Sequence, residues 1–385
     1  MRNVQISLTH FLNESRVLKE VNSLLKHQVV SEVIILALWK QGLKKTETIS
    51  EHTRVIRIYP YVVYVLRRIF NLNEINFIKL LNIYITIYLI KLKPDMINLH
   101  HVNLLGIMSM RSLFKKCKFI YDTHELETET QSSVGQLKAF RRHLETKYIS
   151  TVDYTFVVTP SIEEWYRAEY GIDRISTVMN TPRLHEGLIK RDFFREKFEI
   201  QKQATIFIYN GSLFKGRGIE KLLQVFEEIN DKSHHIVFMG DGEYEDLILE
   251  YSHRNKNIHF HEAVEPNRVI DYTTSADVGV SLIENVCLSY YYCLPNKIFE
   301  YTMAELPMIV SNMKDMSNYI VKNHIGEVAK SFSVADITEA VEKIAKQKDT
   351  YKLAIKKAKL NFNWETEENK LIFAYQSILS RTIIF

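Results

Sequence analysis

The stretch that decides the fold is LPNKIFEYTMAELPMIVSN, residues 294–312. Pro295 and Asn296 begin a predicted helix whose first turn leaves backbone amides free beside Lys297. Glu300 follows about one turn later, where a carboxylate can accept two adjacent hydroxyl groups, as a ribose presents them. A buried strand is expected at 308–311. The stretch is therefore a helix followed by a strand, the unit from which parallel sheets are built.

The same alternation of short apolar runs and helical segments extends along the chain, which indicates parallel sheets and an α/β fold. We expect strands at 5–9, 33–38, 54–59, 96–100, 118–122, 154–159, 176–180, 205–209, 235–239, 258–261, 278–282 and 308–311. Pro182 and the charged, weakly periodic segment that follows it place a domain boundary near residue 185. We therefore predict domains at 1–185 and 186–360, and a C-terminal helix, 361–385, that returns to the first domain.

Length and composition agree with this organisation. The 385 residues suit two α/β domains, and an apolar fraction of 46% with 25% charged residues is typical of a soluble globular protein. The net charge of +4 gives little support to a nucleic-acid partner. Cys117, Cys287 and Cys293 lack the spacing of a disulfide framework or a zinc site. Because the N-terminus also lacks an apolar core of signal-peptide length, we expect a cytoplasmic protein.

The most apolar stretch is FIKLLNIYITIYLIKL, residues 77–92. It is shorter than the roughly 20 residues of a membrane-spanning helix and contains Lys79, Asn82 and Lys91. We interpret it as a buried crossover helix, with an interfacial helix as the alternative. Basic residues gather at 67–68, 111–118 and 138–147. A solvated helix face explains such clusters, and an anionic membrane surface or a phosphorylated acceptor is the sharper alternative.

Two glycine-containing turns follow predicted strands in the second half. NGSLFKGRG, residues 210–218, supplies Gly211, Lys215 and Arg217 between a strand and a helix, an arrangement that suits a diphosphate. A plain strand-to-helix turn fits equally well, and neither GxGxxG nor GK[ST] is present. In FMGDGEYEDL, Gly240 and Gly242 predict a tight turn against which a nucleobase could lie. A turn without a ligand is the alternative there.

Polar residues also follow predicted strands in the first half. FIYDTHELE places His124 and Glu125 directly after a strand, and His100 and His101 end the preceding strand in MINLHHVNLL. Arg16 follows the first strand and is a candidate contact for a phosphate or an acceptor. Because ligands of α/β proteins bind at the carboxyl ends of strands, we expect these side chains to face a cleft between the two domains. Purely structural histidines are the alternative.

At these motifs the sequence resembles glycosyltransferase family 4, the retaining transferases of the GT-B fold. The resemblance covers nearly the whole chain and is clearest at 209–312, where LPNKIFEYTMAELPMIVSN is similar to the family's nucleotide-binding block. It implies two Rossmann-like domains with parallel sheets facing a central cleft. It also implies that Arg217, and Lys215 after it, hold a donor diphosphate, that Glu300 binds the ribose, and that His124 lies close to the transferring sugar.

The sequence departs from the family at one position. Members usually carry two glutamates with seven residues between them, the second on the ribose and the first near the donor sugar. Glu300 fits the second place, but Tyr292 stands where the first is expected. Either Glu284 takes its role, or the tyrosines at 290–292 line a pocket for a different sugar. The identity of the donor is left open by this departure.

The resemblance and the residues together define three predicted sets. The catalytic set is His124, Arg217 and Glu284. The donor-binding set is Gly211, Lys215, Arg217, Gly240, Gly242, Tyr292, Pro295, Asn296, Lys297 and Glu300. The acceptor-binding set is Arg16, His100, His101 and Glu125. We expect no metal site, because the chain has no Asp-x-Asp pair and no His/Cys ligand spacing, and no cofactor besides a UDP- or GDP-sugar as co-substrate.

The implied function is transfer of a sugar from a nucleotide-sugar to a glycan or lipid-linked acceptor. The resemblance implies retention of configuration and a role in bacterial capsule, exopolysaccharide or lipopolysaccharide synthesis. The expected location is the cytoplasm, with peripheral contact between the basic N-terminal clusters and the inner face of the membrane. Two alternatives stay open: a nucleotide-sugar epimerase, and a catalytically silent nucleotide-binding partner suggested by Tyr292.

Overall fold

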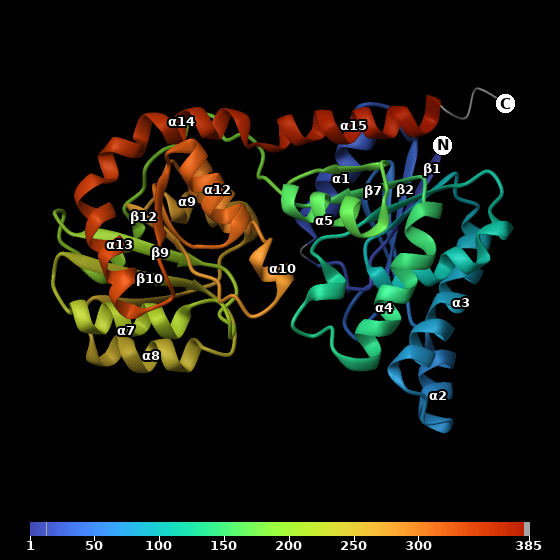
Figure 1. Cartoon of the computed structure of the whole chain (residues 1–385), viewed down its shortest axis with the longest axis horizontal. Helices are drawn as coiled ribbons and strands as arrows, with labels where there is room; N and C mark the ends of the chain where they lie inside the picture. Colours follow the sequence, from blue (N-terminus) through green and yellow to red (C-terminus); the bar gives the residue numbers. More distant parts are fainter. Residues whose placement is uncertain (13, 381–385) are drawn as a thin grey trace. The chain divides into compact units, whose positions relative to one another are not determined.

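The chain forms two compact units. The computed structural model describes residues 1–12 and 14–380. The first unit is Met1–Met179 together with the chain from Glu367 onward, and the second is Asn180–Thr366. Each unit has its own β-sheet (Figure 1). The first division between the units follows Met179, whereas the sequence predicted a boundary near residue 185. Of the expected C-terminal helix, residues 381–385 lie outside the described part of the chain.

The first sheet is parallel except at one edge. Its strands are β1 (Arg2–Ile6), β2 (Glu32–Leu38), β3 (Thr46–Ser50), β4 (Thr53–Ile58), β5 (Met96–Leu99), β6 (Lys118–Asp122), β7 (Tyr154–Val157) and β8 (Ile175–Thr177). Their order is β3-β4-β2-β1-β5-β6-β7-β8, and only β3 pairs antiparallel, with β4. The central strands are buried on both faces, which is why they read as continuous apolar runs.

Helices accompany these strands, and all but the C-terminal helix α15 lie between strands in the chain. They are α1 (Ser15–Lys26), α2 (Tyr61–Ile69), α3 (Glu74–Leu92), α4 (Gly135–Tyr148), α5 (Pro160–Tyr170) and α15 (Trp364–Ser380), with 3₁₀ helices η1 (Val102–Leu113), η2 (Glu127–Glu129) and η3 (Ile149–Thr151). Start and stop signals in the sequence set their ends. In α5, the Thr159 side chain accepts from the Ile162 N–H, Pro160 occupies the first turn, and Gly171 ends the helix with φ 63°.

Helix α3 differs from the expectation for residues 77–92. It begins at Glu74, and among the described residues it is the one helix long and apolar enough to cross a membrane by length and composition. One face is buried, but Ile83, Ile87 and Ile90 on the other face are each about half exposed. The interpretation as a crossover helix between β4 and β5 is confirmed, whereas full burial of the helix was wrong.

The second sheet is parallel throughout. Its strands are β9 (Thr205–Asn210), β10 (His234–Gly240), β11 (Ile258–Glu262), β12 (Val278–Ser281), β13 (Met308–Ser311) and β14 (Gly326–Ala329), in the order β11-β10-β9-β12-β13-β14. The connecting helices are α6 (Phe193–Phe198), α7 (Ile219–Ile229), α8 (Glu245–Arg254), α9 (Val269–Thr273), α10 (Leu288–Tyr291), α11 (Asn296–Met303), α12 (Lys314–Asn323), α13 (Val334–Gln347), α14 (Lys352–Asn361), η4 (Pro266–Arg268) and η5 (Lys348–Tyr351).

The position of α11 on this sheet is set by one tyrosine. Apolar side chains of β9, β10 and β12 pack with those of α7, α8 and α13 on one face of the sheet. On the opposite face the ring of Tyr301 lies over Gly279, where an added Cβ would come within 2.3 Å of it. The Tyr301 hydroxyl lies 3.1 and 3.0 Å from the carbonyl oxygens of Ile208 and Val280. Tyr301 therefore fixes α11 across β9 and β12.

Candidate functional site

The strand order of the second sheet reverses between β9 and β12, its two central strands. The carboxyl ends of these strands form the carboxyl edge of the sheet. Open α/β sheets bind ligands outside such a point. Asn210, the last residue of β9, donates from Nδ2 to Oε2 of Glu300 at 2.7 Å. This contact joins the strand to α11 and holds one carboxylate oxygen in place. Sequence reasoning missed Asn210, although a polar residue ending the apolar run TIFIYN was a visible signal.

Two cations lie at the same edge. Nζ of Lys297 is 3.3 Å from the centroid of the Tyr209 ring, and it would be 3.8 Å from a Cβ added to Gly211. The guanidinium of Arg217 lies 5.0 Å from the centroid of the Tyr290 ring. Burial, and then the charge of Arg217, hold the pKa of Lys297 well below its usual value, while Glu300 acts in the opposite direction. Lys297 and Arg217 are therefore close enough to repel each other.

These cations are suited to an anionic ligand. Within the described part of the chain, neither Arg217 nor Lys297 forms an ion pair with a carboxylate within 4.0 Å. The N-cap residues of α7 and α11 make no side-chain cap hydrogen bond, so first-turn amides can serve as donors, although the Ile298 N–H already donates to the carbonyl oxygen of Pro295. An anion with several oxygens would relieve the repulsion between the two cations and accept from these amides.

The predicted glycines hold the two loops against each other. A Cβ on Gly240 would lie 1.9 Å from the carbonyl oxygen of Gly211, and one on Gly242 would lie 2.6 Å from that of Leu213. Gly218 precedes α7 with φ 75° and is similarly close to Leu282. Because no side chain fits at these contacts, the glycines bring the loop after β9 and the turn after β10 into direct backbone contact.

Other predicted donor residues surround this edge. Lys215 is exposed, and its backbone N–H donates to Glu243. Glu284 follows β12, and its N–H donates to the carbonyl oxygen of Gly216 at 3.1 Å. Tyr292 follows α10 and lies beneath Nζ of Lys314, 5.3 Å from the ring centroid. Pro295 precedes α11, and Asn296 accepts from the side chain of Asn180. The roles of these residues in binding a ligand stay predictions.

The opposite edge of the second sheet is less suited to an anion. A hollow before β9 and β12 is lined by Lys190, Arg195, Asp277 and Lys352, among others. Asp277 pairs with Lys190 at 3.0 Å and with Arg195 at 2.7 Å, and Lys352 pairs with Asp349 at 2.6 Å. Three of the cations that line this hollow are thus paired with carboxylates within the protein.

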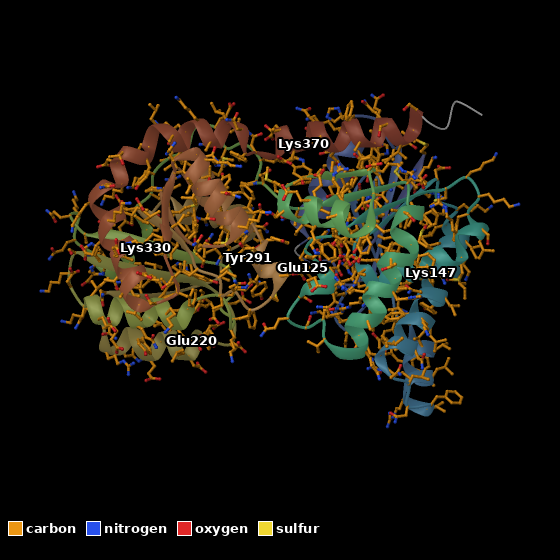
Figure 2. The ribbon with its side chains drawn as sticks, viewed as in Figure 1. Glu125, Lys147, Glu220, Tyr291, Lys330 and Lys370 are labelled. Carbon is orange, nitrogen blue, oxygen red and sulfur yellow. The ribbon has the colours of Figure 1, made fainter. Side chains whose placement is uncertain are left out.

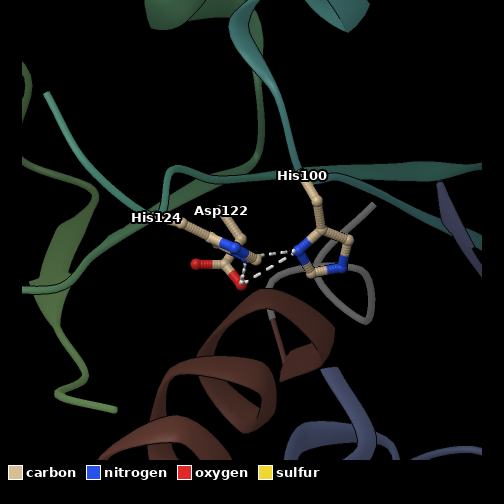
Figure 3. Close-up of side chains that lie close together, drawn as sticks. All are labelled: His100, Asp122 and His124. Atoms are coloured by element: carbon tan, nitrogen blue, oxygen red, sulfur yellow. Dashed lines mark hydrogen bonds and ion pairs between the residues drawn. The ribbon is translucent and has the colours of Figure 1, made fainter. Parts of the chain in front are cut away.

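In the first unit, three predicted or neighbouring side chains converge after β5 and β6. Nδ1 of His100 lies 3.0 Å from Nε2 of His124 and 3.2 Å from Oδ2 of Asp122, and the His124 nitrogen is 3.6 Å from the same oxygen (Figure 3). Burial acts to raise the pKa of Asp122, but Arg16 and the two imidazoles hold it well below its usual value. Burial lowers the pKa of His100, so this ring is neutral near pH 7.

These three residues could in principle hold a metal, since their ligand atoms lie within 4.8 Å of one another. The surroundings fit a divalent cation poorly. Oδ1 of Asp122 accepts from the Arg16 guanidinium at 2.8 Å, so a metal would lie beside a buried positive charge. We therefore interpret the group as a hydrogen-bonded cluster around His124.

Arg16 supports Asp122 from the core. Its side chain is 4% exposed, and besides Asp122 it binds the carbonyl oxygen of Val178 at 2.6 Å and pairs with Glu20 at 3.0 Å. Burial raises the pKa of Glu20 well above its usual value, and the charge of Asp122 adds to the effect. With its donors engaged inside the first unit, Arg16 is placed as a structural residue rather than as the phosphate or acceptor contact considered above.

The other two predicted acceptor-binding residues, His101 and Glu125, differ in their contacts and in their exposure to solvent. Nδ1 of His101 accepts from the N–H of Asn103 and caps η1, while Nε2 lies 3.1 Å from Glu127. Burial, with the charges of Arg141 and His124, lowers the pKa of His101 to about 3. This favours a structural role. Glu125 is exposed (Figure 2).

Residues 190–361 match the family model described as glycosyl transferases group 1. This segment is similar to the members of that family. It lies within the second unit and contains every predicted donor-binding residue. No curated protein sequence matches the chain significantly.

The whole chain has the GT-B fold, as predicted. It is similar to sucrose-phosphate synthase from Thermosynechococcus elongatus, with a TM-score of 0.79 at 15% identity over 99% of this chain and 100% of that one. It is also similar to the lipopolysaccharide outer core galactosyltransferase WaaB (TM-score 0.67, 14% identity, 98% and 99% covered). A third similar structure is Anabaena HepE in complex with UDP (TM-score 0.69, 10% identity, 98% and 100% covered).

Replacing Lys297 by methionine is expected to raise the unfolding temperature of the ligand-free protein. The pKa of Lys297 is lower in the folded protein than in the unfolded chain, so protonation of this amine favours unfolding. The stability associated with the neutral amine is fully present above the unfolded pKa of about 10.5. It is lost as the pH falls through the folded pKa. Methionine keeps the volume and removes the buried charge. The gain should be larger at pH 7 than near pH 10, measured by calorimetry against the exposed control Lys346→Met. An unfolding temperature lowered at pH 7 would contradict the burial of a charged Lys297.

Proposed function

We propose that this protein is a retaining glycosyltransferase of family 4, which transfers a sugar from a nucleotide-sugar to a glycan or lipid-linked acceptor. One observation carries the proposal: Arg217 and Lys297, which form no ion pair within 4.0 Å among the described residues, lie at the same sheet edge as Glu300, whose carboxylate is held by Asn210. Two cations suit the diphosphate of such a donor. A carboxylate fixed at one oxygen suits the adjacent hydroxyls of its ribose.

The chemistry needs stabilisation of the leaving group. As the bond between the anomeric carbon and the diphosphate breaks, negative charge develops on the departing oxygen. Arg217, Lys297 and the free amides of α11 are fixed donors that would bind this charge without reorganisation. In this proposal no divalent metal is required, and the acceptor hydroxyl attacks on the face that the diphosphate leaves. His124 contacts the transferring sugar, and Glu284 or the tyrosines at 290–292 complete the sugar pocket.

A lipid-linked or glycan acceptor in bacterial capsule, exopolysaccharide or lipopolysaccharide synthesis completes the proposal. The descriptions of two similar structures support the proposal. WaaB is a lipopolysaccharide galactosyltransferase, which supports the choice of acceptor, and the HepE structure contains UDP, which supports the choice of donor. We take UDP- and GDP-sugars as the donors to test first.

The decisive experiment incubates the full-length protein with UDP- and GDP-sugars, with and without lipid-linked acceptors, and analyses the products by mass spectrometry and NMR. Sugar attached to the acceptor with the anomeric configuration of the donor is the expected result. Conversion of the nucleotide-sugar to a stereoisomer without acceptor would instead identify an epimerase. Nucleotide binding without any turnover would identify a silent binding protein.

We further propose that α2 and α3 place the enzyme on the inner face of the cytoplasmic membrane. The α2–α3 surface comprises exposed apolar residues interspersed with cations: Tyr61, Val62, Ile69, Phe70, Ile83, Ile87 and Ile90 with Arg67, Arg68, Lys79 and Lys91. The two helices pack together within the first unit. Apolar side chains can enter the headgroup region while the cations bind anionic lipids.

Removing two of these cations is expected to weaken vesicle binding. The double variant Arg67→Ala and Arg68→Ala should lower partitioning onto phosphatidylglycerol vesicles roughly 30-fold, since each cation near an anionic surface contributes about 1 kcal/mol. Co-sedimentation measures this effect. A matched control replaces Lys352 and Lys356 of the second unit by alanine. An equal loss of vesicle binding in both variants, or no vesicle binding by the natural protein, would contradict the membrane proposal.

A further inference from the structure

A line of buried polar side chains runs beneath His124 in the first unit. Asn3 and Gln5 of β1 and Asn98 of β5 are fully buried, and they lie on neighbouring central strands in register Gln5↔Asn98. Amides in such a position cost stability unless each is hydrogen-bonded, and apolar side chains would pack there without that cost. Stability alone therefore does not explain them.

The polar groups form one continuous chain of hydrogen bonds. Nε2 of His100 lies 2.5 Å from Oε1 of Gln5, and Nε2 of Gln5 donates to Oδ1 of Asn3 at 2.6 Å. Nδ2 of Asn3 donates to Oδ1 of Asn98 at 2.9 Å, and Nδ2 of Asn98 donates to the hydroxyl of Tyr375 at 2.5 Å. The chain thus runs from α15 through both strands to His100.

A backbone carbonyl fixes its direction. Nδ2 of Asn3 also lies 3.4 Å from the carbonyl oxygen of Met96, which can only accept. The amide nitrogen of Asn3 must therefore face Met96 and Asn98, and its Oδ1 must accept from Gln5. Oε1 of Gln5 is then left as the acceptor for His100. Reversing any amide in the chain would bring two donors or two acceptors together.

This direction determines the protons on both histidines. His100 must carry a proton on Nε2 to donate to Gln5. Its Nδ1, 3.2 Å from Oδ2 of Asp122, bears a lone pair in the neutral ring and donates to Asp122 only in the charged ring. Next to neutral His100, Nε2 of His124, 3.0 Å from that lone pair and 3.6 Å from Oδ2 of Asp122, must carry a proton. Burial lowers the pKa of His100 although Asp122 acts in the opposite direction, so the assignment applies to the neutral ring. In neutral His124 the remaining nitrogen, Nδ1, is unprotonated.

We propose that the chain Tyr375–Asn98–Asn3–Gln5–His100 holds His124 in the Nε2–H tautomer, so that its Nδ1 accepts a hydrogen bond from a sugar hydroxyl. The identity of that hydroxyl rests on the proposed transferase function, whereas the tautomer does not. The side chain of His124 is 33% exposed, so a ligand can reach it. Gln5, Asn3 and Asn98 are positioning residues in this arrangement, and Asp122 stabilises the ring whenever Nδ1 takes up a proton.

Nuclear magnetic resonance of the histidine side chains tests this directly. Full-length protein is labelled with ¹⁵N-histidine, and long-range ¹H–¹⁵N correlation spectra report which ring nitrogen carries the proton. His100→Gln and His124→Gln variants assign the signals. The natural protein is expected to show Nε2–H for both histidines. In Gln5→Met, His100 loses its acceptor and is expected to donate from Nδ1 to Asp122, which shifts His124 toward the Nδ1–H form.

A further variant separates positioning from general disturbance. Thr86→Val removes a buried hydroxyl of the same unit that donates to the carbonyl oxygen of Asn82 in α3, and it should leave both spectra unchanged. An Nδ1–H form of His124 in the natural protein would overturn the proposal. Unchanged tautomers in folded Gln5→Met would overturn it as well. Neither outcome depends on whether sugar transfer is detected.

Discussion

Replacing Arg217 by alanine is expected to lower kcat of sugar transfer by about 10²- to 10³-fold, the usual effect of removing one fixed donor to developing negative charge. Arg217 is one of two cations at the carboxyl edge of the second sheet, and it lies over Tyr290 with no carboxylate partner among the described residues. Affinity for the nucleoside diphosphate should fall too, because the ground-state ligand already carries this charge. Steady-state kinetics and calorimetric titration measure the two effects separately.

Two further variants make the Arg217 result specific. Arg217→Lys keeps the positive charge but cannot form the bidentate hydrogen bonds of a guanidinium group, so we expect an intermediate loss of kcat. Arg254→Ala is the matched control, because Arg254 also lies over a tyrosine of the second unit, 4.0 Å from the Tyr251 ring centroid, but on α8. Full activity in Arg217→Ala, or equal losses in both alanine variants, would contradict the assigned role.

Replacing His124 by alanine is expected to lower kcat roughly 10- to 150-fold and to leave nucleotide affinity unchanged. The loss corresponds to a hydrogen bond to a sugar that carries positive charge in the transition state, worth about 1.5–3 kcal/mol. His124 belongs to the first unit, whereas Arg217, Lys297 and Glu300 belong to the second, so the diphosphate keeps its contacts. Kinetics with saturating donor, combined with calorimetric titration of the diphosphate, separates the two quantities.

The control for His124 is His143→Ala, an exposed histidine of α4 in the same unit. It should change neither kcat nor affinity. A variant His124→Ala that weakens diphosphate binding as much as Arg217→Ala would mean that the histidine acts on the donor phosphate rather than on the sugar.

Most strands were predictable because a parallel sheet buries both faces and so requires continuous apolar runs. The two missed strands lack that signal for physical reasons. All five residues of β3, TETIS, are exposed at the sheet edge, where pairing with β4 needs no apolar side chain. β14 begins with Gly326, where an added Cβ would lie 2.0 Å from the carbonyl oxygen of Met308, and only its last residue is buried.

The site was predictable where its residues are adjacent in sequence. Lys297 and Glu300 share one helix, and Arg217 follows a strand that must end at the same edge. Contacts between distant residues gave no such signal. Whether Arg16 faces a ligand or the core depends on Asp122, 106 residues later. The amides of Asn3, Gln5 and Asn98 could have been noticed as polar residues at alternate positions of apolar strands, but their common direction requires the fold.

Binding of nucleoside diphosphates tests the central claim most directly, because transfer depends on a diphosphate held at the edge of the second sheet. We would titrate the full-length protein with UDP, GDP and CDP, and with the corresponding nucleosides, by isothermal calorimetry at pH 7. One diphosphate should bind with 1:1 stoichiometry and at least tenfold more tightly than its nucleoside, a difference of about 1.4 kcal/mol or more. Absence of binding by every diphosphate at millimolar concentration, or equal binding of diphosphate and nucleoside, would contradict it.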